Sequence, residues 1–305
     1  MSARREMTQP VTEDDVLTTT AATAPGMTRL LLGNRVAVAA GLVVVGFVAV
    51  GLLAPALAPH APNLQHPEAI RQPPFWYSAG SPQYLLGTDS LGRDLLSRMI
   101  YGARISLLLG VAVVLITLVV GTALGMAAGY FRGWFDAVMS RLVDTLLAFP
   151  FLIFALAIMA ATGPNLVALV AALAFKGWVD FYRVARGDVL AAREADYVTA
   201  ARGLGASTSH ILFREIFPNI VPPLIVLATL RMATIIIAEA SLSFLGIGVP
   251  PSIPAWGTMV SDGRADIAGA WWIATFPGLA ILLLVLCVNL FGEGLRDVLD
   301  PRMRT

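Results

Sequence analysis

The ionisable side chains inside the apolar stretches of this chain are few, and they are the first candidates for chemistry. They are Asp144, Arg231 and Glu239. Ionisable groups at membrane depth are costly, and they typically line a transport path or pair with one another. These three could line a polar path or sense a substrate. They could instead fix a helical bundle, for example through an Asp144–Arg231 pair, and we favour this role because so few charges make a poor proton relay.

Nucleotide hydrolysis is not expected from this chain by itself. A P-loop needs a Gly-Lys pair followed by Ser or Thr, whose backbone and ammonium groups hold the phosphates. The only lysine, Lys176, lies between Phe175 and Gly177. Energy from ATP would therefore have to come from another polypeptide.

Other enzymatic and metal chemistry is also not predicted. No histidine falls in an apolar stretch, so a serine–histidine nucleophile pair within the membrane is implausible. His60, His66 and His210 show no metal-binding spacing, and Cys287 has no second thiol to pair with. We therefore predict that the chain is not an enzyme and holds no metal or cofactor of its own.

The composition is that of an integral membrane protein. Of the 305 residues, 57% are hydrophobic and only 13% are charged, whereas about 25% are charged in an ordinary soluble domain. The formal net charge is +1. Such a balance does not favour nucleic-acid binding, which depends on a basic patch.

The pattern of apolar blocks predicts an all-α membrane protein with six transmembrane helices. Each block approaches the roughly 20 residues that cross a hydrocarbon core of about 30 Å. Six crossings put both termini on one side, and the excess of Lys and Arg on that side places it in the cytoplasm. The predicted spans are Val36–Leu57, Ile105–Tyr130, Leu142–Ala161, Asn165–Phe181, Pro218–Gly246 and Trp271–Phe291.

Two features of the first half concern packing. Gly121, Gly125 and Gly129 are spaced by four residues, which predicts a close helix contact within the subunit or with a partner. Before them, apolar residues from Leu91 to Met99 alternate at helical spacing with charged ones. This spacing favours an amphipathic helix at the outer membrane interface, or one packed on its neighbours.

The stretch Glu194–Pro218 carries charged residues and lies between two apolar blocks. Arginines surround it, so we place it in the cytoplasm as a docking surface for a motor subunit. Its residues resemble the cytoplasmic loop of the permease subunits of bacterial ABC importers. Thr199–Ala201, then Gly205, then Glu215–Pro218 align with that pattern, with departures at Thr199, Glu215 and Phe217.

The resemblance assigns roles to individual residues of this loop. It implies a coupling helix that docks on the ATPases. Small side chains would let the helix seat in a groove, Gly205 would allow a sharp turn, and Ser207 would cap the next short helix. The predicted docking residues are Ala200, Ala201, Gly205, Ala206 and Ser207.

Two further stretches resemble the C-type subunit of the oligopeptide, dipeptide and nickel branch of this family. They are GTDSLGRDLLSRMIYGARISL from Gly87 and EASLSFLGIGVPPSIPAWGTMV from Glu239, and the tail GLRDVLDPRMR is similar too. The resemblance implies the type I importer permease fold, in the bacterial cytoplasmic membrane. An outer face toward a binding protein would carry Asp89, Arg93, Asp94 and Trp256, although these loops could also simply cap the bundle.

The implied partners are a homologous B-type permease, two ATPase subunits that bind ATP and Mg, and an extracytoplasmic substrate-binding protein. The expected organisation is a cytoplasmic tail (1–34), a first helix with an outer segment (35–104), a five-helix core with a coupling loop at 183–217 (105–295), and a second tail (296–305). Peptide import is the leading hypothesis. Import of nickel or another small solute is the alternative, and a secondary carrier or channel is the alternative from a different class.

Overall fold

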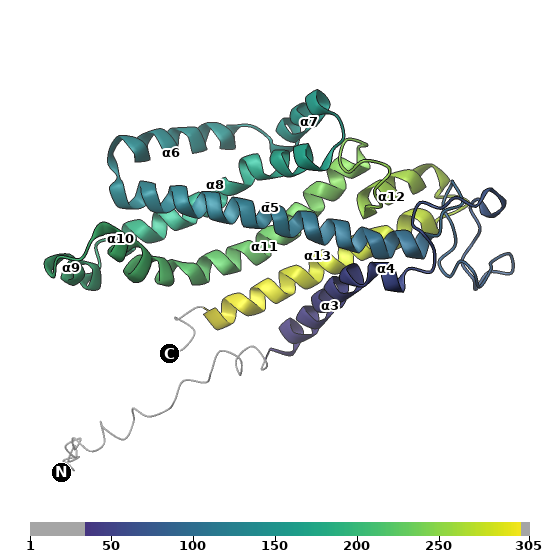
Figure 1. Cartoon of the computed structure of the whole chain (residues 1–305), viewed down its shortest axis with the longest axis horizontal. Coiled ribbons are helices and arrows are strands. Elements are labelled where there is room, and N and C mark those ends of the chain that lie inside the picture. Colours follow the sequence, from purple (N-terminus) through teal and green to yellow (C-terminus); the bar gives the residue numbers. More distant parts are fainter. Residues whose placement is uncertain (1–33, 300–305) are drawn as a thin grey trace, which may run out of the picture.

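A computed structural model describes residues 34–299 of the chain, so most of both predicted tails lies outside the described residues. The described part is an elongated bundle of long helices, with an irregular segment at one end and the short helix α9 at the other (Figure 1). It contains no β-strand, only an isolated bridge between Thr88 and Asp94. The predicted all-α class is confirmed.

The helices follow one another as short and long elements. Short 3₁₀ turns, η1 (Pro67–Ala69) and η3 (Arg264–Asp266), lie between them. A π-helical turn, η2 (Ile211–Ile216), precedes one long helix. The α-helices are α3 (Arg35–Leu52), α4 (Ala54–Leu57), α5 (Leu95–Phe131), α6 (Gly133–Ala148), α7 (Phe151–Thr162), α8 (Leu166–Ala192), α9 (Asp196–Gly203), α10 (Thr208–His210), α11 (Phe217–Phe244), α12 (Trp256–Gly263) and α13 (Trp272–Leu299).

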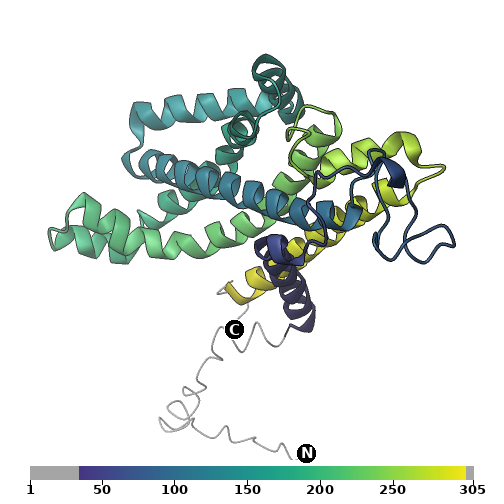
Figure 2. The ribbon, with the colours of Figure 1, turned by 45° about the vertical axis from the view of Figure 1, so that its right-hand side comes forward.

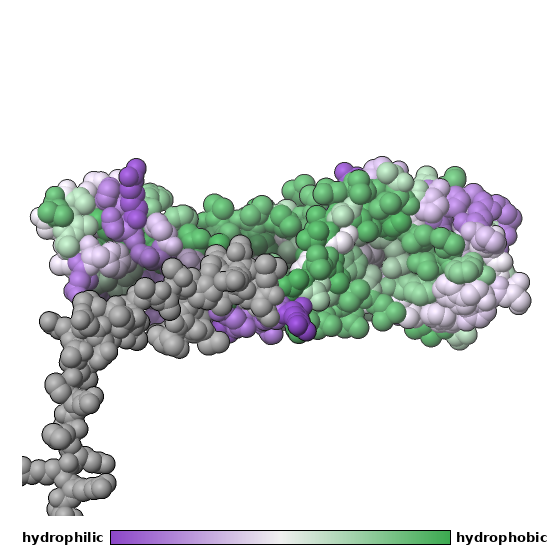
Figure 3. Space-filling model, turned by 90° about the horizontal axis from the view of Figure 1, so that it is seen from below, coloured by the Kyte–Doolittle hydropathy of each residue, from purple (hydrophilic) through white to green (hydrophobic). Residues whose placement is uncertain are grey.

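The long helices lie side by side in a fixed order. α6 and α7 flank one side of α5 and α8, and α13 with α3 lies on the other side of the bundle (Figures 1 and 2). α11 lies between these groups and contacts α5, α8 and α13. Hydrophobic residues cover much of the surface between the ends, and hydrophilic residues gather at the ends (Figure 3). This distribution fits a protein that crosses a membrane along its long axis.

The described residues contain fewer clear spans than the six predicted. Four segments are long and apolar enough to cross a membrane: α3, α5, Thr208–Phe244 and α13. A fifth exists if α6 and α7 count together, but these two helices meet at 87°. The predicted third span therefore breaks, because Pro150 lacks an amide hydrogen and restricts the residue before it. The predicted fourth span is α8, which carries Lys176, Asp180 and Arg183 within its length.

The predicted outer amphipathic helix does not exist as a separate element. Residues 95–104 are the first turns of α5, and the helix begins after Asp94, whose side chain accepts a hydrogen bond from the Ser97 amide at 2.9 Å. Gly92 has a φ of +73°, so the chain turns there and is not helical. Leu95 is completely buried. The helical spacing therefore indicated a helix that packs on its neighbours, which was the alternative to an interfacial one.

The glycine stripe of α5 is a contact within the subunit. A Cβ atom at Gly125 would lie 2.6 Å from the carbonyl oxygen of Tyr182, and one at Gly129 would lie 2.9 Å from that of Arg186. Both carbonyl groups belong to α8. The backbones of α5 and α8 therefore approach as closely as small residues allow.

The helical segment that contains α11 begins earlier than Pro218, which was the predicted start of the fifth span. α10, η2 and α11 form one continuous helical segment from Thr208 to Phe244. Pro218 lies in the first turn of α11, whereas Pro222 and Pro223 lie inside it. The widened π-helical turn precedes these prolines, and such turns are a common way for a long helix to accommodate an interruption.

Candidate functional site

The turn after α9 is built by Gly205. α9 ends at Gly203, and Gly205 follows with a φ of +81°, the left-handed region that favours glycine. The Gly205 amide donates to the carbonyl oxygen of Arg202, and the Ala206 amide donates to that of Ala201, both at 3.0 Å. This pair of hydrogen bonds is the Schellman arrangement that ends a helix. The turn predicted at Gly205 is present.

Ser207 begins the next helical segment. Its Oγ accepts a hydrogen bond from the His210 amide at 3.3 Å, so it caps α10 as predicted. The turn and the cap are separated by Ala206 alone. The direction of the chain between α9 and α10 is therefore set by local hydrogen bonds.

The turn has a buried side and an exposed side. Val198, Ile211 and Ile216 are buried, and Ala201 and Ala206 pack partly against this cluster. The side chain of Leu204 is 89% exposed, more than any other large apolar side chain in the described residues. The sequence interpretation missed Leu204, although it is the only large apolar residue from Gly203 to His210.

Tyr197 and Phe213 are also exposed near this turn, at 41% and 64%. Together with Leu204 they are the exposed large apolar residues of this region, and we call the three residues the loop tip. Exposed apolar groups on an otherwise polar end of a protein typically mark an interaction site. Of the predicted docking residues, Ala200, Gly205 and Ser207 are exposed, and Ala201 and Ala206 face the interior in part.

The loop is fastened to the end of α5. The guanidinium groups of Arg193 and Arg202 lie 5.8 and 5.9 Å from the ring centre of Tyr130. Arg132 forms an ion pair with Glu194 at 3.1 Å. Arginines over an aromatic ring add a cation–π attraction to the packing, so α9 is held against the helix that also contacts α8.

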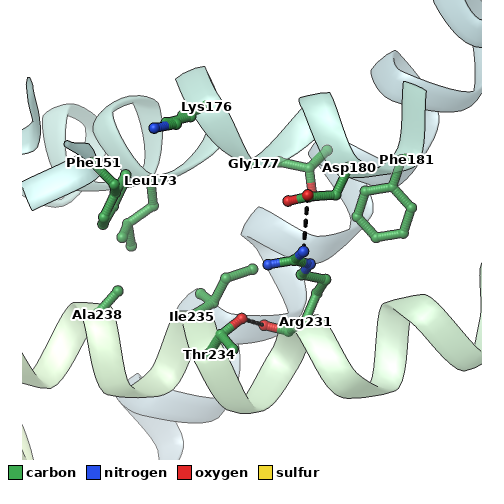
Figure 4. A pocket seen from close by; sticks show the side chains of 11 residues that line it. Phe151, Leu173, Lys176, Gly177, Asp180, Phe181, Arg231, Thr234, Ile235 and Ala238 are labelled. Carbon is green, nitrogen blue, oxygen red and sulfur yellow. Dashed lines mark hydrogen bonds and ion pairs between the residues drawn. The ribbon is translucent and has the colours of Figure 1, made fainter. Parts of the chain in front are cut away.

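A cavity of about 250 Å³ lies between α8 and α11 (Figure 4). Asp180 of α8 and Arg231 of α11 point toward each other across it and form an ion pair at 2.8 Å. Both side chains are about one-third exposed. The ammonium of Lys176 donates to the carbonyl oxygen of Phe149 at 2.6 Å, at the break between α6 and α7.

The suggested Asp144–Arg231 pair is wrong, because Arg231 pairs with Asp180. Asp144 lies on α6 with an exposed side chain and does not line the cavity. The sequence favoured an internal pairing of intramembrane charges but missed the partner. The predicted span that contains Asp180 ended at Phe181, whereas α8 continues to Ala192.

Glu239 is buried and holds three parts of the chain together. The Ser243 hydroxyl donates to its carboxylate at 2.8 Å, and the Ser106 hydroxyl of α5 donates at 3.4 Å. The oxygen of Ser243 also accepts from the Val249 amide. Since Glu239 does not line the cavity, these contacts support its structural role.

The four residues predicted to face a binding protein are all buried, which corrects that prediction. Asp89 and Asp94 have exposures of 2% and 1%, Arg93 of 7% and Trp256 of 1%. Arg93 donates to Asp89 at 2.6 Å, and the Trp256 indole donates to the Met99 carbonyl at 2.9 Å. Buried charges are stable only when paired, so these side chains join the outer segment to α5 and α12.

Asp262 of α12 completes this cluster. Its carboxylate lies 3.3 Å from the guanidinium of Arg93. Burial raises the pKa of Asp262, and the positive charges of Arg93 and Arg98 act in the opposite direction. Within residues 34–299, no group of three or more His, Cys, Asp or Glu side chains is arranged to hold a metal ion.

Comparison with known proteins gives two family matches. Residues 121–305 match the model of the binding-protein-dependent transport system inner membrane component. Residues 27–74 match the N-terminal transmembrane domain of oligopeptide transport permease C. The two matches cover the core of the bundle and the first helix.

Curated relatives are similar over most of their length. The di/tripeptide transport system permease protein DppC of Pseudomonas aeruginosa is 46% identical over 253 residues, covering 83% of this chain and 84% of the relative. The dipeptide transport system permease protein DppC of Escherichia coli is 44% identical, covering 89% and 90%. The glutathione transport system permease protein GsiD of Pectobacterium atrosepticum is 41% identical, covering 91% and 90%.

A solved structure supports the fold. A chain of the MetNI methionine ABC transporter, in an inward-facing conformation, matches with a TM-score of 0.56 and 17% identity, covering 68% of this chain and 98% of that chain. At this identity the likeness bears on the fold alone. The predicted ABC importer permease fold is confirmed.

Proposed function

This chain belongs to the family of binding-protein-dependent transport system inner membrane components, and on that premise we propose that it is the C-type permease subunit of an ATP-driven importer of di- or oligopeptides. The peptide assignment is supported by relatives named for dipeptide transport that are 44 to 46% identical over most of the chain. A match to the N-terminal domain of oligopeptide permease C supports the C-type assignment.

In this assembly the chain forms half of the translocation path. A homologous B-type permease supplies the other half, two ATPase subunits bind ATP and Mg beneath it, and an extracytoplasmic binding protein delivers the peptide. The absence of a P-loop in the sequence supports this division of labour. The chain itself contributes the path and the coupling surface, and no catalytic group.

We place α9 on the cytoplasmic side of the bacterial inner membrane, with both termini. The start of α3 and the end of α13 lie together, because a Cβ atom at Gly294 would contact Ala37 and lie near Asn34. Both ends of the described chain are therefore on the same side. The arginines around Glu194–Pro218 favour the cytoplasm for that end.

The observation that carries the coupling proposal is the continuity from the loop tip to the cavity. Leu204 projects from a turn fixed by two hydrogen bonds, and α10 begins three residues after Gly205. The helix then runs without a break to Phe244 and presents Arg231 to the cavity. A rise of 1.5 Å per residue gives this segment a length of about 55 Å, so movement of the loop tip would reach the cavity.

We assign the partly exposed Asp180–Arg231 pair to the wall of the path. An ion pair at membrane depth is tolerated where it borders water or another protein chain. A peptide carries a charge at each end, and a paired cation and anion could hold each end weakly in passing. Asp144 is exposed on α6 outside the cavity, so we do not assign it to this wall.

Replacing Leu204 with Asp tests the docking role of the loop tip. In the assembly reconstituted with both ATPases, we expect peptide uptake to fall and ATPase binding to weaken by about thirtyfold, because an apolar interface hot spot is typically worth about 2 kcal/mol. Uptake into proteoliposomes and co-purification of the ATPases would be measured. Leu64→Asp is the matched control, since Leu64 is 50% exposed at the opposite end.

Two outcomes would contradict the docking role of the loop tip. If Leu204→Asp inserts, binds both ATPases normally and transports peptide like the unchanged chain, the loop tip is not the coupling surface. If Leu64→Asp is equally impaired, the effect is general destabilisation. Thermal melting of the purified variants would separate misfolding from loss of docking.

A further inference from the structure

The irregular segment before α5 carries an uncharged stretch. Residues 72–88 contain no Asp, Glu, Lys or Arg, and they lie between Arg71 and Asp89. Within the stretch, Phe75, Trp76 and Tyr77 follow one another, with exposures of 51%, 50% and 43%. We call these three residues the outer aromatic tip. Its exposed area is aromatic and uncharged, although it lies at a polar end of the molecule.

The outer aromatic tip has a defined conformation. The Tyr77 amide donates to the Pro74 carbonyl at 3.0 Å, and the Gly80 amide donates to the Tyr77 carbonyl at 2.8 Å. Gly80 packs so tightly that an added Cβ would overlap the Pro74 carbonyl group. Two successive turns therefore hold the three rings outward.

The tip is attached to the beginning of α13. The Trp271 indole donates to the Tyr77 hydroxyl at 3.2 Å. The ring of Trp76 meets the ring of Phe276 edge to face, with centroids 6.1 Å apart. Phe276 lies four residues after the first residue of α13, which is about 6 Å along the helix. Trp76 therefore lies beside the second turn of α13 and not beyond its end.

The same side of α13 continues as an apolar stripe. Leu279, Leu283 and Leu286 follow Phe276 at helical spacing, with exposures of 52%, 46% and 49%. Because α13 is one of the four clear spans, these leucines are at membrane depth. The outer aromatic tip thus extends an exposed apolar surface of the span to its end.

We propose that the outer aromatic tip inserts into the phospholipid headgroup region of the bilayer and anchors the outer segment there. Tryptophan and tyrosine favour this region because their rings are apolar and their N–H and O–H groups remain hydrogen-bonded. The tip carries no charge that could steer a soluble partner, and its continuity with the apolar stripe of α13 favours lipid as the occupant. The choice of the outer leaflet rests on the proposed function, whereas the insertion into a bilayer does not.

A fluorescent label at position 76 tests this proposal. Trp76→Cys would be made in a Cys287→Ser background, labelled with bimane, and placed with its partner subunits in nanodiscs containing brominated phosphatidylcholine. We expect blue-shifted emission, loss of fluorescence in brominated lipid and weak quenching by aqueous iodide. Glu68→Cys is the matched control, because its side chain is 73% exposed in the same segment, and its label should behave as if in water.

An unlabelled variant gives an independent measurement. Trp76→Phe should lose part of the quenching of intrinsic tryptophan fluorescence by brominated lipid, without altering peptide uptake or its ATP dependence. Two results would overturn the proposal. One is a label at position 76 that is quenched by iodide as strongly as the label at position 68. The other is a label that leaves water only when the binding protein is added, which would make the tip a protein docking site.

Discussion

At the scale of single residues, the turn after α9 separates two roles that lie next to each other in sequence. Gly205 supplies a backbone conformation, with its φ of +81° and its hydrogen bond to Arg202. Leu204 supplies an exposed apolar side chain. The position of Leu204 depends on the Gly205 turn. Substitutions of the two residues should therefore have different effects on docking and coupling.

We expect Gly205→Ala to weaken coupling by distorting the turn. No atom lies within 4 Å of an added Cβ at this position, so the cost is that of left-handed backbone, about 1 to 2 kcal/mol. ATP hydrolysis by the assembly should become partly independent of uptake, measured as peptide transported per ATP hydrolysed.

Gly203→Ala is the control for this substitution. Gly203 also has open space around it, lies in the last turn of α9 and has no positive φ. Alanine there should favour the helix by up to about 1 kcal/mol. Equal transport per ATP in both variants would show that the left-handed turn is not needed.

At the scale of elements, the contact of α5 with α8 organises the inner half of the bundle. α5 is fastened to α9 through Tyr130, and α8 carries Asp180 to the cavity. The glycines of α5 let the two backbones approach each other. An increase in the distance between these two helices would therefore shift both the loop and the wall of the cavity.

We expect Gly125→Ala to destabilise this helix pair. The added Cβ would lie 2.6 Å from a backbone carbonyl oxygen of α8, and overpacking of this kind typically costs about 1 to 3 kcal/mol. The melting temperature of the purified subunit in detergent should fall.

Gly187→Ala is the matched control, because Gly187 lies on α8 and no atom lies within 4 Å of an added Cβ. Its melting temperature should stay the same or rise slightly. If Gly125→Ala melts at the same temperature as the unchanged chain, the two helices can move apart without loss of stability. The glycine stripe would then not be a tight helix contact.

At the scale of the whole molecule, the apolar middle lies between two hydrophilic ends with different constructions (Figure 3). One end is a helical loop with exposed apolar groups, and the other is an irregular segment with a buried Asp89–Arg93 pair, which also contacts the more exposed Asp262. The contact of Arg93 with Asp262 joins the outer segment to α12, which packs on α11 and α13. α11, which is continuous with α10, therefore connects the two ends.

At this scale we predict that ATP, and not the proton gradient, supplies the energy for uptake. In cells carrying the complete assembly, peptide uptake should stop when ATP is depleted while the proton gradient is kept. It should continue when an ionophore collapses the gradient and ATP is maintained. Labelled dipeptide uptake measures both conditions. Continued uptake without ATP would instead indicate a secondary carrier.

The sequence by itself determined the features that depend on local composition. Apolar length predicted the four clear spans, the surroundings of Lys176 excluded a P-loop, and Gly205 with Ser207 predicted the turn and cap that are present. Each of these depends on neighbouring residues in the chain. The family resemblance came from motifs of the same local kind.

The tertiary structure alone decided which distant side chains meet. Arg231 pairs with Asp180 and not with Asp144, and Arg93 pairs with Asp89 in the interior, where a surface role had been expected. The pairing of charges depends on which helix faces come together and on how much solvent they lose. Helical spacing specifies a face, but it does not say what covers that face.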